Sequence, residues 1–322
     1  MINYKNQEPS QTVDISDWLT DEAYNGTYPK GARAKITCFC PHDSPYNFLI
    51  ANPDSKYRHR YIFKLSFNRY PAQFWAEIVA YRIGCLMQVS VPPSFAAINK
   101  KENQYGALIE WFYHDYPPGD KEHYIDGGVF MKQLIPNFDS KKGKQHNFET
   151  IMKLKTISTC NWLEEWGKIF IFDAVIGNTD RHQDNWGVIG KPREKTLDVA
   201  LSPAFDNGTS LGHEMFECNF NRFDDKNYLD RYVQKGTYHM KWKLADNDKT
   251  TIMKFIRLFA DNYPEQKADM LNCLNFSIEE ATEQIMQLTK FQIPEALSEA
   301  RAKFMIRLIA YRQKLLNALL EK

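Results

Sequence analysis

The segment GNTDRHQDNW, residues 177–186, places a dense group of polar side chains directly behind an apolar stretch. Three amides, two aspartates, an arginine and a histidine follow residues 169–176, which are apolar apart from Asp173. Such an apolar stretch predicts a buried helix, and the polar segment predicts the loop that ends it. Because titratable and amide groups gather on loops at functional sites, we expect this loop to carry chemistry.

The loop contains an aspartate, Asp180, followed five residues later by an asparagine, Asn185. Phosphoryl transfer uses this arrangement, because the carboxylate accepts the proton of the attacking hydroxyl while the amide oxygen helps to hold Mg²⁺. An amide suits the second position, since a hard cation prefers oxygen and a further negative charge would repel phosphate. The spacing also arises by chance, so the hypothesis requires partners elsewhere in the chain.

A second segment, LSPAFDNGTS at residues 201–210, supplies a candidate metal ligand. Asp206 follows an apolar, strand-like stretch and precedes a glycine turn, as the principal magnesium ligand of a kinase does. Considered alone, the pair Asn207 and Gly208 also fits an ordinary turn.

Two further segments are candidates for holding a nucleotide. Lys64 lies in the strand-like segment 61–65, where its ammonium could reach phosphates. Glu77 is the only acid in the interior of the next predicted helix, and its carboxylate could hold the Lys64 side chain in position. Small and basic residues occur earlier, at 28–35, where backbone amides and cations could approach phosphate. The candidate nucleotide-binding residues of this loop are Lys30, Gly31, Ala32, Arg33, Ala34 and Lys35.

These segments follow the order that a kinase requires: nucleotide loop, strand lysine, helix glutamate, apolar hinge at 108–112, catalytic loop and metal aspartate. Each signal is weak by itself, but together they favour a phosphotransferase that uses ATP and Mg²⁺. The P-loop, dinucleotide-binding and zinc-protease patterns GxxxxGK[ST], GxGxxG and HExxH do not occur.

The sequence pattern predicts an α+β protein with a two-lobed, protein-kinase-like fold. We expect a small β-rich lobe at residues 1–113 and a larger helical lobe at 114–322, with a cleft between them. The strands are expected at 34–40, 47–51, 60–67, 95–99 and 105–112. The helices are expected at 71–84, 162–175, 251–260, 278–288 and 294–320, and a surface loop at 114–146.

Composition excludes several classes of partner. The 322 residues carry a net charge of +1, so bulk electrostatics indicates neither direct nucleic-acid binding nor an acidic membrane. Uninterrupted apolar runs stay well below the roughly 18–20 residues that a membrane span needs. Six cysteines occur without a signal-peptide pattern, which favours a cytoplasmic protein with free thiols, and secretion into a host cell stays open.

Four segments together resemble the HipA-like kinases, and the chain is similar to the short-form members of that family over roughly residues 26–320. The similarity lies in PKGARAK, FKLSF and, above all, GNTDRHQDNWGV followed by LSPAFDNGTSLG. The resemblance implies a bacterial serine/threonine protein kinase that acts as a toxin or effector, with an antitoxin as a further partner.

The resemblance also implies a role for each matching residue. Asp180 corresponds to the catalytic base and Lys64 to the lysine that contacts ATP. His182 corresponds to a nucleotide contact, and Asn185 and Asp206 to metal ligands. The adenine-binding hinge corresponds to Glu110, Trp111 and Phe112.

One position departs from the family. Longer HipA toxins carry an inhibitory phosphoserine just before the glycine of the nucleotide loop, and this chain has Tyr28 there, with Thr27 adjacent. We therefore expect autophosphorylation, if it occurs, at Thr27.

Two other functions remain open from the sequence. DRHQDN also resembles the D-R-H-x-x-N loop of phosphoinositide kinases, which favours a lipid or small-molecule kinase. A nucleotide-binding pseudokinase that acts as a scaffold is the alternative from another class. The chain is nearly neutral, and the segment 207–225 after Asp206 holds one arginine among several acids, so we expect a protein hydroxyl as the acceptor.

Overall fold

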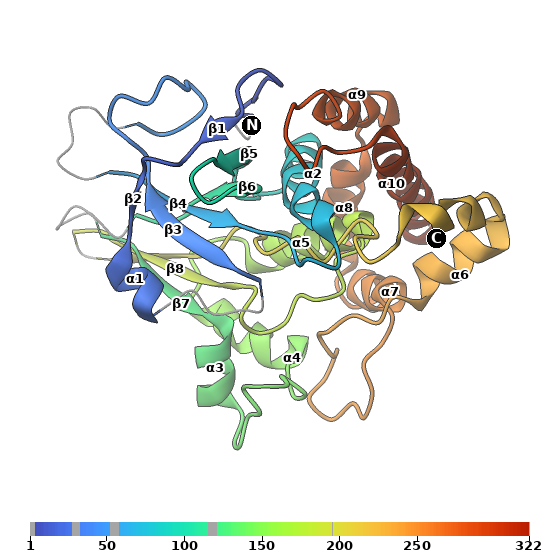
Figure 1. Cartoon of the computed structure of the whole chain (residues 1–322). Coiled ribbons are helices and arrows are strands. Elements are labelled where there is room, and N and C mark those ends of the chain that lie inside the picture. The colour runs from blue at the N-terminus through green and yellow to red at the C-terminus, as the bar shows by residue number, and fades with distance from the viewer. Residues whose placement is uncertain (1–3, 28–32, 52–57, 115–120, 195, 322) are drawn as a thin grey trace.

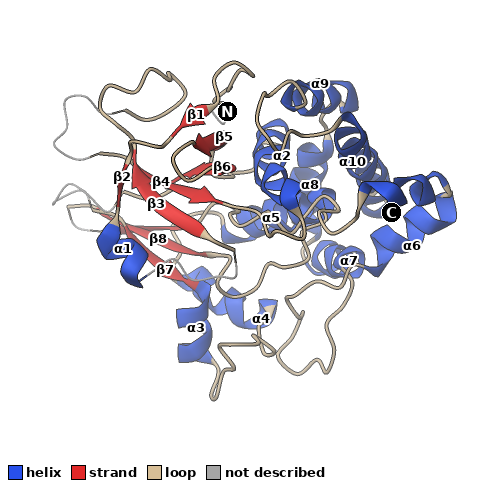
Figure 2. Ribbon diagram, in the orientation of Figure 1, coloured by secondary structure: helices blue, strands red, loops and turns tan. Residues whose placement is uncertain are grey.

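The computed structural model describes the chain except for residues 1–3, 28–32, 52–57, 115–120, 195 and 322. One side of the molecule is rich in strands and the other consists mainly of helices (Figures 1 and 2). No helix in the described part is both long enough and apolar enough to cross a membrane.

The strand-rich part is built on one six-stranded sheet with the order β1-β5-β6-β4-β3-β2. Its strands are β1 (Val13–Asp14), β2 (Leu19–Thr20), β3 (Lys35–Phe39), β4 (Arg60–Lys64), β5 (Ser94–Asn99) and β6 (Gln104–Glu110). Helix α1 (Glu22–Thr27) follows β2, and α2 (Phe74–Leu86) packs against β5 and β6. The register pairs Lys35 with Lys64 across β3 and β4, so two lysines lie side by side at one end of the sheet.

The helical part surrounds α5 (Trp162–Ile176), which packs against α7, α8 and α10. The other helices are α3 (Gly127–Leu134), α4 (Phe148–Ile151), α6 (Lys226–Lys235), α7 (Ile252–Asn262), α8 (Lys267–Leu274), α9 (Ile278–Leu288) and α10 (Glu299–Leu320). A three-stranded sheet with the order β7-β8-β9 carries the loops of the site, with β7 (His123–Asp126), β8 (Gly187–Pro192) and β9 (Leu197–Leu201). Because α5 is buried along most of its length, its end fixes where the following loop begins.

The α+β fold class is confirmed, and the long helices and most predicted strands lie within a few residues of their expected positions. Helix α9 coincides with the prediction, and α10 begins five residues later than the predicted 294 because Ser298 caps it by accepting the Arg301 N–H. Helix α2 runs past Gly84, where the predicted helix ended. A Cβ at Gly84 would lie 2.4 Å from Val91 Cγ2, so the glycine permits close packing instead of ending the helix.

Two predictions were wrong. Residues 47–51 form turns instead of a strand, because Phe48 is buried against Phe95, with ring centroids 4.8 Å apart, without pairing its backbone in the sheet. The predicted loop at 114–146 contains β7 and α3. β7 exists because it pairs with β8, which follows it by more than 60 residues, since Asp126 pairs with Gly187 and His123 with Gly190. α3 begins where Asp126 accepts the N–H of Val129. The strands β8 and β9 were not predicted.

Helix α5 ends at Gly177, whose φ of +70° lies in the left-handed region. Its N–H donates to the Asp173 carbonyl oxygen, which closes the last turn. The guanidinium of Arg312, from α10, lies directly against it, and a Cβ at Gly177 would stand 2.3 Å from Arg312 Cζ. The start of the polar loop therefore depends on a glycine for two separate reasons.

We expect Gly177→Ala to lower the free energy of unfolding by at least roughly 1–2 kcal/mol, the cost of a left-handed non-glycine residue, with the contact to Arg312 adding to it. Denaturant unfolding of the purified protein measures the change. Gly190→Ala in β8 is the matched control, because its Cβ would make only ordinary contact with Leu197 at 3.4 Å. Equal stability of the two variants would contradict the expectation.

Candidate active site

The loop after α5 is held by a buried arginine that the sequence analysis did not single out. Arg181 is fully buried and uses all five of its N–H groups. Nε and Nη2 donate to the two carboxylate oxygens of Asp173, at 3.0 and 2.6 Å. Nη1 donates to the carbonyl oxygens of Asn185 and Phe205, and Nη2 also reaches Asn207 Oδ1 at 3.0 Å. One side chain thus joins α5 to two loops. They are the predicted catalytic loop, residues 177–186, and the predicted metal loop around Asp206, residues 202–212.

Asp173 is the buried partner of this arginine. Burial raises its pKa, and Arg181 and the hydroxyl of Tyr238, which donates at 2.8 Å, oppose the rise by stabilising the carboxylate. The signal that could have identified the pair is the lone acid within the apolar stretch 169–176, because a carboxylate buried in a helix requires a cation or several donors.

The backbone of the catalytic loop orients Asp180 and Asn185. Asn178 Oδ1 accepts the N–H of Asp180 at 3.1 Å, and the carbonyl oxygen of Asp180 accepts Nδ2 of Asn185 at 2.9 Å. Since the Asn185 amide nitrogen is used as a donor within the loop, its Oδ1 is left for a cation. The loop therefore holds a carboxylate and an amide oxygen in a fixed relation.

Burial raises the pKa of Asp180. His182 and Lys249 lower it, and the nearby charge of Asp206 raises it further. A carboxylate with a raised pKa is a stronger base than an exposed aspartate. The two predicted functional loops lie close to one another, because Nη1 of Arg181 donates to carbonyl oxygens of both, those of Asn185 and Phe205.

Asp206 belongs to a compact charged cluster between the sheet and the helical part. Its φ is +57°, and its Oδ1 accepts Nζ of Lys64 at 2.5 Å and Nη2 of Arg33 at 3.0 Å. Glu77 Oε1 accepts the same two cations, Lys64 at 2.8 Å and Arg33 at 2.5 Å. Glu77 Oε2 accepts the N–H of Asn207 at 2.8 Å. Lys64, Glu77 and Asp206, which the sequence placed in one site, are thus brought together.

The cluster contains two acids and two cations, and the cations decide the charge of the acids. Burial raises the pKa of Asp206, but Lys64 and Arg33 outweigh it and hold that pKa far below its usual range. The same two cations outweigh burial and lower the pKa of Glu77. Burial, together with Lys64, lowers the pKa of Lys35 to about 8. Asp206 is therefore ionised and able to bind a metal at any physiological pH.

The cluster contains a buried guanidinium donor for which a nucleotide phosphate would be a suitable acceptor. Nη1 of Arg33 is buried and has no hydrogen-bond partner within the described part of the chain. Gly208 leaves the space that Arg33 occupies, since a Cβ there would lie 2.2 Å from Nη1. A buried guanidinium donor requires an acceptor, and a phosphate oxygen is a suitable one.

The two predicted metal ligands, Asn185 and Asp206, would suit a magnesium ion that arrives with a nucleotide. Both cations of the cluster contact Oδ1 of Asp206, and the Asp206 side chain retains 30% exposure. No group of three or more His, Cys, Asp or Glu side chains that could hold a metal occurs in the described ranges. Mg²⁺ commonly uses one or two carboxylates together with substrate phosphates, so Asn185 and Asp206 are an adequate protein contribution.

Part of the predicted nucleotide loop cannot be placed. Lys30, Gly31 and Ala32 lie outside the described residues. The carbonyl oxygen of Ala34 accepts the N–H of Leu65 at 3.0 Å, so this part of the loop joins the strand that carries Lys64. Thr27 is the last residue of α1, and its side chain also lies outside the described part.

The predicted hinge runs from the end of β6 into the following loop. The side chain of Glu110 does not face the charged cluster but binds Lys5 Nζ at 2.5 Å. The N–H groups of Glu110 and Trp111 already donate to carbonyl oxygens of Pro93 and Arg60. Phe112 stacks on Phe205, one residue before Asp206, with ring centroids 5.1 Å apart. Of the three residues, Phe112 is the one whose ring the structure brings next to the metal loop.

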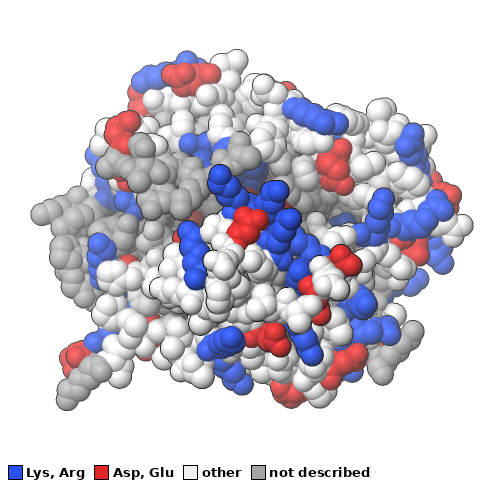
Figure 3. All heavy atoms as spheres, turned by 90° about the horizontal axis from the view of Figure 1, so that it is seen from below, with Lys and Arg blue, Asp and Glu red and all other residues white. Residues whose placement is uncertain are grey.

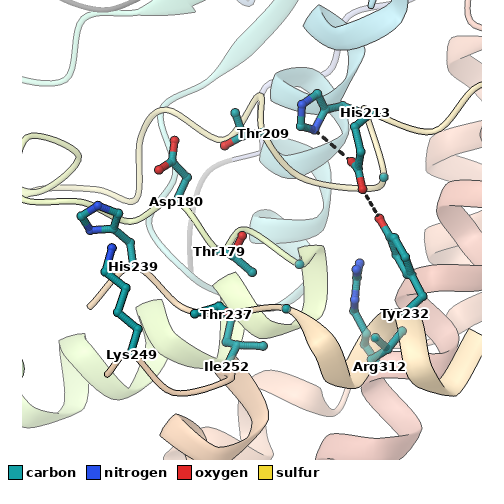
Figure 4. A pocket seen from close by; sticks show the side chains of 15 residues that line it. Thr179, Asp180, Thr209, His213, Tyr232, Thr237, His239, Lys249, Ile252 and Arg312 are labelled. Carbon is teal, nitrogen blue, oxygen red and sulfur yellow. Dashed lines mark hydrogen bonds and ion pairs between the residues drawn. The ribbon is translucent and has the colours of Figure 1, made fainter. Parts of the chain in front are cut away.

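His182, predicted to contact the nucleotide, lies next to Asp184 and His239. Its Nδ1 accepts the N–H of Asp184 at 3.2 Å, and its ring lies 5.7 Å from that of His239. His239 lines a cavity of about 530 Å³ that also contains Asp180 (Figure 4). The other lining residues are Gly177, Thr179, Thr209, Gly212, His213, Glu214, Tyr232, Val233, Gly236, Thr237, Lys249, Ile252 and Arg312. Sequence reasoning missed this wall because α6, α10 and the 236–251 segment carry no recognisable motif.

A serine within the metal loop also matches a hydrolase pattern. Residues 208–212, GTSLG, fit the G-x-S-x-G sequence of serine hydrolases. Ser210 is 1% exposed, and its hydroxyl donates to the Asn207 carbonyl oxygen at 2.6 Å. A nucleophile must be accessible, so the serine has a structural role in this turn.

The fold resembles solved structures of kinase-like proteins. The proinflammatory kinase CtkA of Helicobacter pylori has a TM-score of 0.71 and 17% sequence identity, with 96% of each chain covered. HipA of Shewanella oneidensis, solved with HipB and operator DNA, has a TM-score of 0.52 and 13% identity, covering 94% of this chain and 67% of that one. No curated protein matches the sequence.

A family model matches the sequence of this chain. The model described as the HipA-like C-terminal domain matches residues 27–230, which is more than half of the chain. This range includes the charged cluster, the catalytic loop and the metal loop. The chain therefore belongs to the HipA-like family and has a kinase-like fold.

Proposed function

We propose that the protein is an ATP- and Mg²⁺-dependent serine/threonine protein kinase that is able to autophosphorylate. The observation that carries the proposal is the convergence of two loops and a strand. Arg181 joins the loop with Asp180 and Asn185 to the loop with Asp206 by hydrogen bonds to both. Asp206 in turn accepts Nζ of Lys64 from the strand. Membership of the HipA-like family supports the same conclusion.

Each side chain has a distinct role in this proposal. Asp180 accepts the proton of the acceptor hydroxyl, and its raised pKa favours that transfer. Asn185 Oδ1 and Asp206 hold the magnesium ion, which when bound neutralises negative charge on the phosphates. Lys64 and Arg33 bind phosphate oxygens. Glu77 holds both cations in place by accepting a hydrogen bond from each of them. Glu77 is thus a positioning residue.

The proposal extends to organisation and partners. We propose that residues 1–113 and 114–322 act as the two lobes around the nucleotide. A protein hydroxyl is the acceptor, and Thr27 is the candidate site of autophosphorylation. HipA of Shewanella oneidensis was solved with HipB, which supports an antitoxin as a possible class of partner and a toxin or effector role for this chain.

Asp180→Asn is expected to lower the rate of phosphoryl transfer by about 10²–10⁴, because the amide keeps the shape but cannot accept a proton. Binding of Mg-ATP should change little. Single-turnover transfer from labelled ATP to protein, with calorimetry of Mg-ATP binding, measures both. Asp184→Asn, at an exposed carboxylate of the same loop, is the matched control. Activity of Asp180→Asn within a few-fold of wild type would remove Asp180 from the mechanism.

Asp206→Ala is expected to weaken Mg-ATP binding itself, since it removes the charged metal ligand. Lys64→Ala should behave in the same way, because it removes a phosphate contact. Calorimetry in the presence and absence of Mg²⁺ separates the two variants: the loss in Asp206→Ala should depend on the metal more than the loss in Lys64→Ala. Unchanged Mg-ATP affinity of Asp206→Ala would show that the metal binds elsewhere.

The same labelled-ATP assay distinguishes the alternative functions. Faster transfer of labelled phosphate to phosphatidylinositol vesicles than to protein would show that the protein is a lipid kinase. Nucleotide binding without turnover in the wild-type protein would establish a pseudokinase.

A further inference from the structure

The cavity beside Asp180 is the place where an acceptor must enter, if Asp180 accepts the proton of the hydroxyl. Its volume of about 530 Å³ is within the range of sites that hold a small molecule or a few residues of a peptide. The wall comes from the loop after α5, the metal loop, α6 and the segment that leads to α7 (Figure 4). The charges of this wall therefore decide which acceptors fit.

Two charged residues at one end of the cavity are already compensated within the chain. Glu214 accepts the hydroxyl of Tyr232 at 2.7 Å and lies 3.4 Å from Nδ1 of His213, as the dashed lines of Figure 4 show. Arg312 is buried and donates to the Ile176 carbonyl oxygen at 3.1 Å. The charge of Glu214 opposes the lowering of the Arg312 pKa by burial, so these two opposite charges offset one another at this end of the cavity.

Lys249 lies at the other end, near Asp180 and His239. It forms no hydrogen bond or ion pair with the described residues, although it is half-buried. Burial and the charge of Lys241 lower its pKa, and Asp180 opposes them. Burial, together with Lys249, lowers the pKa of His239 to about 4, so the imidazole is neutral at pH 7 and leaves Lys249 as the cation of this end.

We propose, on the basis of the kinase function proposed above, that the cavity binds a protein segment in which a carboxylate lies next to the acceptor hydroxyl. Lys249 binds that carboxylate while the hydroxyl contacts Asp180. A half-buried ammonium that forms no hydrogen bond or ion pair with the described residues gains from such a contact, because the ligand restores the interactions that burial removed. The substrate class is thus a serine- or threonine-containing peptide with an acidic neighbour, and Lys249 determines the specificity.

The observations favour a carboxylate over a phosphorylated headgroup. Asp180 and Glu214 line the same cavity, and a ligand with several phosphates would meet these two negative charges and, at the end beside Asp180, the single lysine Lys249. The face seen from below in Figure 3 carries basic and acidic residues interspersed, which does not form the polybasic field that an anionic bilayer selects.

A positional-scanning peptide library tests the proposal with the full-length protein and labelled ATP. Each library fixes a central serine and places Glu, Gln or Lys at one position within three residues of it. Wild type should prefer Glu over Gln at one position by about 5- to 30-fold in kcat/KM, the range for a partly buried ion pair. Lys249→Met should lose this preference, Lys249→Arg should keep it, and Lys249→Glu should reverse it toward Lys.

Lys243→Glu is the matched control, because Lys243 is an exposed lysine of the same segment and should leave the acidic preference unchanged. A wild-type enzyme that phosphorylates the peptides without preferring acids would overturn the inference, and so would a preference that survives in Lys249→Glu. Faster transfer to phosphatidylinositol vesicles would overturn it as well. Absence of any turnover in wild type would instead reject the proposed kinase function, so the two failures are distinguishable.

Discussion

The buried pair of Arg181 and Asp173 is the constraint on which the site depends. A guanidinium without solvent is tolerated only when its charge and all its donors are satisfied, and removing one partner leaves an uncompensated buried charge. Here the five donors of Arg181 are divided among a helix, the catalytic loop and the metal loop. Any large movement of one loop would break a buried hydrogen bond, so the pair fixes how the loops face each other.

A second group of charges joins this assembly to the sheet. Arg33 and Lys64 come from the strand-rich part, and both contact Asp206 in the metal loop and Glu77 in α2. Because two acids and two cations neutralise one another, the site carries ionised side chains away from water without a large net charge. A phosphate would share the two cations with Asp206, and a metal would compensate that carboxylate. The resting contacts therefore resemble the interactions that a bound Mg-nucleotide would require.

The cavity proposed to receive the acceptor differs from the charged cluster in how its charges are balanced. The charged cluster is held by hydrogen bonds and ion pairs between its own acids and cations, whereas Lys249, in the cavity beside Asp180, feels the charge of Asp180 but forms no hydrogen bond or ion pair with the described residues. In the proposed kinase the charged cluster would bind the same phosphates in every reaction, so its balanced charges do not have to select between ligands. The Lys249 ammonium, which lacks an ion pair with the described residues, could select between acceptors, because it favours ligands of opposite charge and disfavours the others.

The sequence by itself determined the features that are encoded locally. Helices such as α9 follow from apolar periodicity. Asp180, Asn185, Lys64 and Asp206 are predicted as site residues from short segments in a characteristic order. Tertiary structure alone decided that β7 pairs with β8, that Arg33 reaches Asp206, that Arg181 holds two loops together, and that Lys249 lies in the cavity with Asp180. The physical reason is that periodicity and turn chemistry act between near neighbours. The partner of a buried charge or of an edge strand is set by packing between distant segments, and no local pattern encodes it.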